Sequence, residues 1–245
     1  MKRIRFTRNK ALLSTTPDTT EVEYAAAGSV DLASVRLLPP CAPTKIVCVG
    51  RNYAEHAKEL GNEAPAEPLI FLKPPSTLIA SGDAIVYPNA SQRVDWEGEL
   101  GVIIGKRGRN IKREDAFEYI AGYTCVNDVT ARDLQKKDGQ WTRGKGFDTF
   151  CAVGPWMVTP DEVDLAKLQV RTVVDGAVKQ DAPVTDMIFP VDVILAYVSA
   201  FMTLEPGDLI ATGTPPGVGA VSPGSTIRIE IDGIGVLENA VVREA

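Results

Sequence analysis

The chain runs Asp95-Trp96-Glu97-Gly98-Glu99-Leu100-Gly101-Val102-Ile103-Ile104 through the segment that decides the fold. If this segment is one strand, alternation puts the side chains of Glu97 and Glu99 on the same face and close together. A second apolar run, from Tyr119 to Val126, ends just before Asp128. Two apolar strands would therefore bring three carboxylates toward one point.

The residues alone leave two interpretations of these carboxylates open. A Glu-x-Glu pair is typical of the solvated face of an antiparallel sheet, and Asp95 would share that face. Alternatively, a divalent cation relieves the repulsion among Glu97, Glu99 and Asp128. All-oxygen ligation suits a hard cation, and Mg²⁺ in particular keeps positions open for water or substrate. Mn²⁺ would fit nearly as well.

Length and composition indicate a soluble globular protein. The 245 residues, 44% hydrophobic and 24% charged, are enough for one domain with a small appendage. The chain contains 26 Lys and Arg residues and 32 Asp and Glu residues. The resulting net charge of −6 argues against a nucleic acid partner. A small anionic substrate fits if local basic residues attract it.

Cysteine usage and hydropathy point to the cytoplasm. Cys41, Cys48, Cys125 and Cys151 show no CxxC spacing, and we expect reduced, buried thiols. The basic first ten residues are not followed by an apolar signal core. The longest apolar stretch, residues 189–204, is interrupted by Pro190 and Asp192 and is too short to span a membrane.

The chain divides into two parts at a proline cluster, Leu37-Leu38-Pro39-Pro40-Cys41-Ala42-Pro43. Residues 1–43 form a small N-terminal segment with a polar Ser/Thr/Pro stretch, and we expect a catalytic domain over residues 44–245. Short β-branched runs dominate this second part, and they cover residues 46–49, 84–87, 168–174, 208–212, 225–231 and 236–242. Asp175-Gly176 and Asp232-Gly233 are typical hairpin turns.

Helical patterns are few and cover residues 53–60, 130–137 and 191–202, the last after the start signal Pro190. No regular alternation of strands and helices occurs, which disfavours a doubly wound sheet. The prediction is therefore a mainly β fold of the α+β class, a mixed β-roll or sandwich with peripheral helices.

His56 is the only histidine, so imidazole chemistry at neutral pH must use it. Glu59 lies three residues on and would share its helical face. A carboxylate that orients an imidazole makes a general base able to activate water. The alternative is a surface pair of little consequence.

The stretch Gly139-Gln140-Trp141-Thr142-Arg143-Gly144-Lys145 imitates a phosphate-binding loop, but we reject that interpretation. Gly146 lacks the required hydroxyl, and the sequence after it is strand-like where a helix should begin. Lys145 stays a candidate because the glycines on either side would allow a ligand to approach the backbone closely, unless this is only a flexible loop. A helix starting near Thr130 would carry Arg132 and Gln135 on the face nearest the metal.

Six ordered blocks together resemble the fumarylacetoacetate hydrolase family over residues 44–245. They are Gly50-Arg51-Asn52-Tyr53 with His56 and Glu59, Phe71-Leu72-Lys73-Pro74, Glu97-Gly98-Glu99-Leu100, Asn127-Asp128-Val129-Thr130-Ala131-Arg132-Asp133-Leu134-Gln135, Gly144-Lys145-Gly146-Phe147-Asp148 and Thr212-Gly213-Thr214-Pro215. The resemblance implies a homodimeric β-roll with Mg²⁺ or Mn²⁺ on Glu97, Glu99 and Asp128, and His56 and Glu59 on a lid segment. It also implies that Lys145 stabilises enolate charge and that Arg51, Arg132, Gln135 and Thr214 bind substrate.

One departure narrows the expected reaction. Members that cleave fumarylacetoacetate carry a further metal carboxylate seven residues before the histidine, where this chain has Val49. The smaller acylpyruvate hydrolases are the closer match, so we expect a 2-oxo acid substrate, a metal-stabilised enolate and carbon-carbon hydrolysis releasing pyruvate. Oxaloacetate decarboxylase or tautomerase activity and hydroxyheptadienedioate isomerase activity use the same enolate. A non-catalytic dimer that binds metal or metabolite is the alternative from another class.

Overall fold

A computed structural model describes residues 1–8, 23–29 and 31–245. Its largest sheet contains ten strands, eight in one continuous order and two that pair beside it. In order these are β2 (Glu23–Ala26), β1 (Lys2–Arg8), β12 (Cys151–Val158), β10 (Ile120–Asp128), β9 (Gly98–Ile104), β15 (Leu209–Ala211), β4 (Ile46–Gly50) and β5 (Leu69–Lys73), with β3 (Val35–Leu38) paired to β1 and β6 (Leu78–Ile79) to β12.

Two smaller sheets complete the β structure. The five-stranded sheet has the order β14 (Ala177–Pro183), β13 (Gln169–Val174), β17 (Thr226–Ile231), β18 (Gly235–Arg243) and β7 (Ile85–Tyr87), and the three-stranded sheet has the order β11 (Thr130–Ala131), β8 (Val94–Trp96) and β16 (Gly219–Val221). Asp175-Gly176 and Asp232-Gly233 join hairpins as predicted. The predicted mainly β architecture is confirmed.

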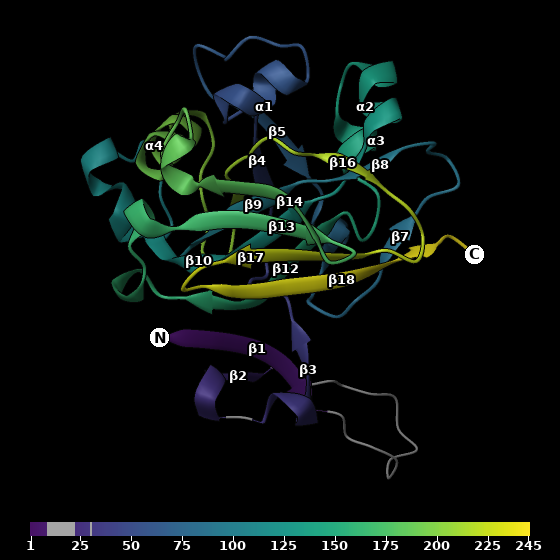
Figure 1. Cartoon of the computed structure of the whole chain (residues 1–245). Helices are drawn as coiled ribbons and strands as arrows, with labels where there is room; N and C mark the ends of the chain where they lie inside the picture. Colours follow the sequence, from purple (N-terminus) through teal and green to yellow (C-terminus); the bar gives the residue numbers. More distant parts are fainter. Residues whose placement is uncertain (9–22, 30) are drawn as a thin grey trace.

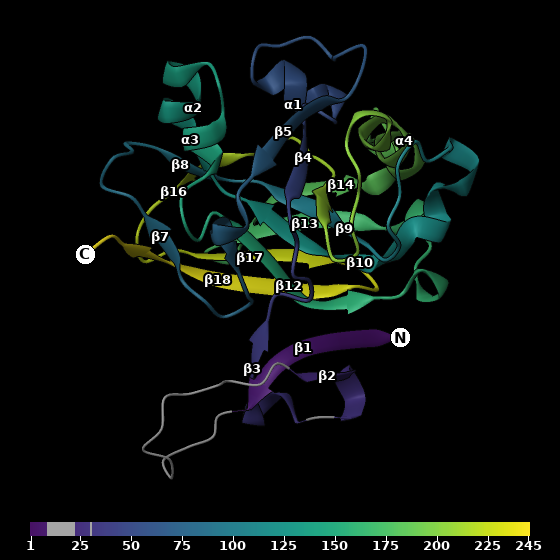
Figure 2. The same ribbon diagram turned by 180° about the vertical axis from the view of Figure 1, so that it is seen from behind.

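The helices are short and peripheral. They are α1 (Ala54–Glu59), α2 (Arg132–Asp138), α3 (Thr142–Lys145) and α4 (Val191–Phe201), with 3₁₀ turns η1 (Ala27–Ser29), η2 (Leu32–Ser34), η3 (Pro75–Thr77), η4 (Arg113–Tyr119), η5 (Pro160–Glu162), η6 (Leu165–Lys167) and η7 (Val184–Asp186). Figures 1 and 2 show α1, α2 and α3 at the end of the molecule opposite the N-terminal strands. The helix predicted over 130–137 begins later than expected because Thr130 and Ala131 pair with β8.

The segment expected to form one strand is in fact two, and this prediction was wrong. Glu97 lies between β8 and β9, which belong to different sheets. The Glu97 amide donates to the side-chain Oδ1 of Asn127 at 3.0 Å, so a side chain replaces the backbone partner that a continuous ladder would supply. The chain therefore crosses from one sheet to the next at the first of the three carboxylates.

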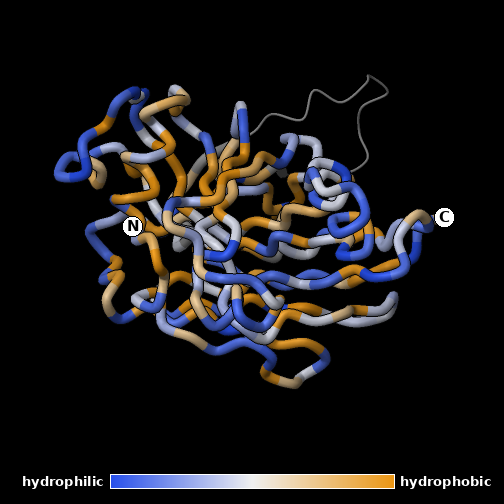
Figure 3. The backbone as a smooth tube through the Cα atoms, turned by 90° about the horizontal axis from the view of Figure 1, so that it is seen from above, coloured by the Kyte–Doolittle hydropathy of each residue, from blue (hydrophilic) through white to orange (hydrophobic). Residues whose placement is uncertain are grey.

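The interior is apolar and all four cysteines lie within it as free thiols, which confirms the reduced state predicted for them. Figure 3 shows hydrophobic stretches of the backbone alternating with hydrophilic ones, and several of the outermost turns are hydrophilic. Within the described residues, no helix combines the length and apolar character that crossing a bilayer requires.

The N-terminal strands join the large sheet through β1, which pairs with β12 at Lys2 and Val158. The polar stretch of the segment 1–43 lies outside the described residues. The division into residues 1–43 and 44–245 stays a prediction.

Candidate active site

The three carboxylates meet as predicted. Glu97 from the β8–β9 junction, Glu99 from β9 and Asp128 from the end of β10 offer oxygens that all lie within 4.8 Å of one another. Their exposed fractions are 5%, 2% and 1%, so the alternative of a solvated sheet face is wrong. They form the floor of a cavity of about 300 Å³.

Lys145 reaches this floor from the end of α3. Its ammonium donates to Glu97 Oε2 at 2.7 Å and to Asp128 Oδ2 at 2.6 Å. Burial acts to lower the pKa of Lys145, but the Asp128 and Glu97 carboxylates outweigh burial and raise the pKa above its ordinary value. Lys145 is therefore charged when the site is free of metal. Its ammonium lies beside the cluster of three carboxylates and donates to two of them.

Arg132 and Gln135, both on α2, are buried beside the same floor, as the helical spacing predicts. The Arg132 guanidinium donates to Glu97, to Asp95 at 2.9 Å and to the Gln135 side chain at 2.8 Å. Asp95 is thus a partner for Arg132, and it is not one of the three residues that gather as a metal-binding group.

Sequence reasoning gave Lys73 no role, although it is fully buried next to Asp128. Its ammonium, at the end of β5, donates to Asp128 Oδ1 at 2.5 Å and to the Val129 carbonyl at 3.1 Å. Lys73 and Lys145 thus engage opposite oxygens of one carboxylate. This arrangement fixes the orientation of Asp128.

The surroundings of Glu99 indicate whether a cation fits among the three carboxylates. Among the described residues no basic side chain forms an ion pair with Glu99, whose Oε2 accepts only the Gly213 amide at 2.8 Å. Burial raises the pKa of Glu99 well above its ordinary value, and Asp128 and Glu97 raise it further. A hard divalent cation on Glu97, Glu99 and Asp128 would supply the positive charge that Glu99 lacks, so the residues fit such an ion.

His56 and Glu59 form the pair predicted for them, on α1 at the side of the pocket. His56 Nδ1 lies 3.2 Å from Glu59 Oε2, and His56 is 4% exposed. Burial lowers the pKa of His56 below its ordinary value of 6.5, against the opposing effects of Glu97 and Glu59. The Glu59 carboxylate also accepts the Gly217 amide at 3.1 and 3.2 Å, which ties α1 to the loop before β16.

Thr214 lies in the pocket wall, held by a glutamine that sequence reasoning missed. Gln180, on β14, donates to the Thr214 hydroxyl at 2.7 Å and accepts the Gly98 amide at 3.1 Å. The Thr214 hydroxyl in turn donates to the Gly98 carbonyl at 2.9 Å. The five-stranded sheet thereby supports the residue that separates Glu97 from Glu99.

The glycines beside Lys145 have a different use from the one expected. A Cβ on Gly144 would lie 2.8 Å from the Gln135 backbone nitrogen, and one on Gly146 would lie 2.4 Å from the Thr142 carbonyl. They let α3 pack against α2 and itself, and the expectation that they admit a ligand was wrong. Val49 lines the pocket and presents an apolar side chain there.

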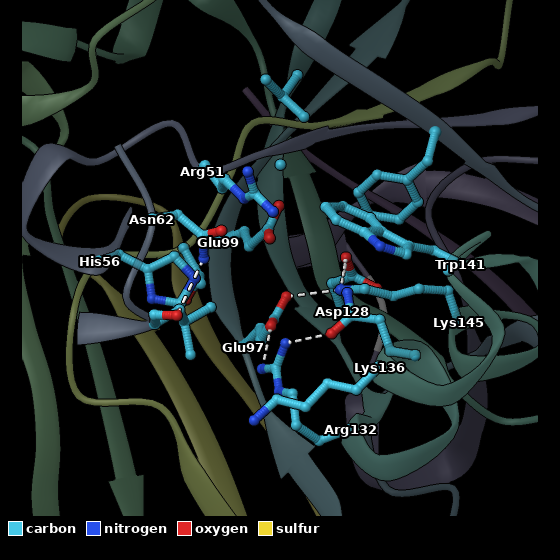
Figure 4. A pocket seen from close by; sticks show the side chains of 17 residues that line it. Arg51, His56, Asn62, Glu97, Glu99, Asp128, Arg132, Lys136, Trp141 and Lys145 are labelled. Carbon is cyan, nitrogen blue, oxygen red and sulfur yellow. Dashed lines mark hydrogen bonds and ion pairs between the residues drawn. The ribbon is translucent and has the colours of Figure 1, made fainter. Parts of the chain in front are cut away.

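Four residues that are only partly buried or exposed line the mouth of the pocket, and sequence reasoning gave a role to one of them, Arg51. Arg51, Asn62, Trp141 and Lys136 line it, and Figure 4 shows them around the carboxylates. Arg51 was expected to bind substrate, and its guanidinium lies 5.9 Å from the Trp141 ring centroid. Arg51, Asn62 and Trp141 lie outside the helices and strands, and Lys136 lies on α2.

The mixed sheets bring together a buried cluster of three carboxylates that could hold a metal ion, with a lysine beside it. Residues 45–242 match the family described as Fumarylacetoacetate (FAA) hydrolase C-terminal. The chain belongs to this family.

Relatives within the family carry different activities in their names. A mitochondrial oxaloacetate tautomerase from Xenopus laevis is 45% identical over 221 residues, which cover 86% of this chain and 69% of the relative. The crystal structure of a 2-hydroxyhepta-2,4-diene-1,7-dioate isomerase from Mycobacterium marinum matches with a TM-score of 0.85 and 42% identity, over 100% of this chain and 99% of that one. A maleylpyruvate hydrolase from Sphingobium sp. SYK-6, in complex with manganese(II) and pyruvate, matches with a TM-score of 0.77 and 38% identity, over 91% and 78% of the two chains.

Proposed function

We propose that the protein is an enzyme dependent on a divalent metal, Mg²⁺ or Mn²⁺, that hydrolyses a carbon-carbon bond in acylpyruvate-type 2-oxo acids and releases pyruvate. The observation that carries this proposal is the His56–Glu59 pair, of which His56 lines the same pocket as the three carboxylates and Lys145. We further propose that it works as a homodimer, as the family resemblance implies.

Glu97, Glu99 and Asp128 would hold the cation, which when bound supplies a Lewis acid for the carboxylate and keto oxygens of the substrate. Arg132, Gln135 and Thr214 surround the floor and bind the substrate carboxylate. The Lys145 ammonium donates to the keto oxygen as negative charge develops there, which is a large effect in a buried site.

His56 acts as the general base. Donation of Nδ1–H to Glu59 leaves Nε2 unprotonated, and burial keeps the ring neutral at pH 7 because it lowers the pKa. Nε2 takes a proton from water, and the hydroxide adds to the distal carbonyl carbon. The bond between that carbon and the neighbouring methylene carbon breaks, its electron pair forms the pyruvate enolate, and the proton returns to the methylene carbon.

A second candidate is proton transfer without cleavage, as an oxaloacetate tautomerase or a hydroxydienedioate isomerase. The names of the relatives at 45% and 42% identity favour it. Loss of carbon dioxide from oxaloacetate would pass through the same enolate. All three reactions use the floor of the pocket, and only hydrolysis requires His56 to activate water.

The test compares wild type and His56→Ala with Mg²⁺ on acetylpyruvate, fumarylpyruvate, oxaloacetate and a hydroxydienedioate. Loss of a general base lowers the rate by about 10²–10⁴-fold, so we expect that loss for hydrolysis of the first two acids. Enol absorbance and released pyruvate are measured. Full hydrolase activity in His56→Ala would show that His56 is not the general base. Mg²⁺ binding without turnover of any of the four acids would favour a binding protein.

A further inference from the structure

One loop connects the two sides of the pocket. It follows β15 and runs from Gly213 to Gly217. The Gly213 amide donates to Glu99 Oε2 at 2.8 Å, on the floor of the pocket. The Gly217 amide donates to the Glu59 carboxylate at 3.1 and 3.2 Å, on the α1 side. The position of this loop therefore affects a proposed metal ligand and the partner of the proposed base together.

Gln180 holds the middle of this loop from the five-stranded sheet. It lies on β14, and its side chain is 1% exposed. Its Nε2 donates to the Thr214 hydroxyl and to the Pro215 carbonyl, both at 2.7 Å. Its Oε1 accepts the Gly98 amide at 3.1 Å and the Thr172 hydroxyl at 2.6 Å. The buried amide group thus uses both of its hydrogens and both of its lone pairs, so only one orientation satisfies it.

The hydrogen bonds at Thr214 can run in one direction only. Because the Gly98 amide can only donate, the oxygen of the Gln180 side chain faces Gly98 and the nitrogen faces Thr214. The Thr214 hydroxyl then gives its hydrogen to the Gly98 carbonyl at 2.9 Å. No hydrogen of this hydroxyl is left for a substrate oxygen. A hydrogen bond from Thr214 to the substrate must therefore come from its backbone amide, and the hydroxyl serves to place the loop.

β14 contacts the same loop a second time, next to Glu59. A Cβ on Gly217 would lie 2.1 Å from the carbonyl oxygen of Lys179, the neighbour of Gln180 on β14. The Gly217 backbone thus lies directly against β14 while its amide donates to Glu59. One strand of the five-stranded sheet places both the middle of the loop and its α1 end.

We infer that Gln180 is a positioning residue for the proposed reaction. By holding the loop on β14 it keeps the Gly213 amide at Glu99 and the Gly217 amide at Glu59. This inference rests on the proposed function, in which Glu99 holds the metal and Glu59 orients His56. Gln180 itself does not line the cavity and acts only through the loop. Groups that orient metal ligands in this way contribute about 10- to 100-fold to metal affinity or activity.

The experiment measures Mg²⁺ affinity by isothermal titration calorimetry, together with kcat and KM for acetylpyruvate. In Gln180→Met we expect Mg²⁺ affinity to fall by about 10- to 100-fold, because Glu99 loses a fixed partner. We expect kcat at saturating Mg²⁺ to fall by about tenfold as well, because Glu59 loses its position. A merely structural role would lower the melting temperature and leave the Mg²⁺ affinity and KM of the folded protein unchanged.

Two changes at Thr214 show whether Gln180 acts through the loop. Thr214→Val keeps the shape and removes the hydroxyl, and we expect Mg²⁺ affinity to fall by about fivefold, the effect of one hydrogen bond. Thr214→Ser keeps the hydroxyl and should restore the affinity to within about twofold of wild type. Because both residues act on one loop, the double variant Gln180→Met with Thr214→Val should bind Mg²⁺ no more weakly than Gln180→Met alone. Additive losses would overturn the inference.

Gln169→Met is the matched control. Gln169 lies on β13 of the same sheet and donates to Asp181 at 2.9 Å, but its side chain is partly exposed, so Mg²⁺ affinity and kcat should not change. A Gln180→Met protein that melts lower but binds Mg²⁺ as wild type does would overturn the inference and leave the proposed function intact. If Gln180→Met does not fold, wild-type Mg²⁺ affinity in Thr214→Val would overturn it. Weakened Mg²⁺ binding in the variants of a wild type without turnover would support the positioning role and overturn the proposed hydrolysis.

Discussion

The floor of the pocket comes from strands that run through the sheets, whereas its α1 side is a helix of six residues. β9, which carries Glu99, is paired on both edges, to β10 and to β15. α1 has no side-chain N-cap, and helices this short are marginal without tertiary contacts. The geometry proposed to bind metal is thus built into the sheets, while the proposed base lies on a short helix that the hydrogen bond from the Gly217 amide to Glu59 helps to hold.

The largest effect is expected at the floor, from Glu99→Gln. Loss of a charged ligand should abolish metal-dependent turnover, by about 10³-fold or more. Burial and the nearby Asp128 and Glu97 raise the pKa of Glu99, so its charge opposes folding at neutral pH when metal is absent. Metal-free Glu99→Gln should therefore melt about 2–4 °C higher than wild type.

Calorimetry of metal-free and Mg²⁺-loaded protein measures the melting temperatures, and a rate assay with Mg²⁺ measures turnover. Wild type should gain stability with Mg²⁺ and Glu99→Gln should gain little, because only the former keeps all three ligands. Unchanged turnover in the variant would show that Glu99 is not a ligand.

A smaller effect is expected from Lys73→Met, which keeps the bulk of the side chain and removes the ammonium from Asp128. Breaking a buried ion pair typically costs about 3–5 kcal/mol, and loss of a group that orients a ligand costs about 10- to 100-fold in activity. Thermal denaturation and kcat at saturating Mg²⁺ measure the two effects. The control is Lys167→Met, which breaks the exposed pair with Asp164 and should change neither quantity. A Lys73→Met protein as active as wild type would contradict an orienting role.

The smallest effect is expected on α1, from Glu59→Gln. Hydrolysis should slow by about tenfold, part of the 10²–10⁴-fold that a general base supplies, because His56 loses its partner. In wild type the acid limb of the kcat/KM profile should lie below pH 6.5, since burial lowers the pKa of His56 and activity is lost only as pH falls through that value. Glu59 acts to raise this pKa, so the limb should move to still lower pH in the variant.

The same helix offers a matched control for Glu59→Gln. Glu55 and Lys58 share the i,i+3 spacing of His56 and Glu59 but are largely exposed, 3.8 Å apart. Lys58→Ala should leave the pH profile and the rate unchanged. An acid limb above pH 6.5 in wild type would mean that a group other than a buried neutral His56 controls the rate.

Motifs in the sequence predicted the parts of the site that depend on local spacing. The three carboxylates and the His56–Glu59 pair meet as expected because each follows from a strand end or a helical turn. Lys73 was given no role, since a lysine at a strand end is usually solvated and its partner Asp128 lies 55 residues away. Gln180 was missed for a similar reason, because its contact with Thr214 joins different parts of the chain.

Local patterns also misjudged the continuity of the backbone. Apolar alternation runs on from Asp95 to Ile104, but the side chain of Asn127 takes the Glu97 amide and ends the ladder there. The glycines around Lys145 were assigned to ligand approach, whereas their lack of side chains serves the packing of α3. Both errors depend on tertiary contacts that a one-dimensional pattern does not contain.

Gly98 separates two proposed metal ligands, and a Cβ at this position would lie 2.2 Å from the Thr172 hydroxyl oxygen on β13. The five-stranded sheet therefore packs directly against the residue between Glu97 and Glu99 and fixes where the backbone lies there. A protein engineer who grafts the acidic trio onto another scaffold would have to transplant β13 and Gln180 with it. Copying the Glu-Gly-Glu sequence alone would transfer the two carboxylates without β13 and Gln180, which hold the backbone between them in place.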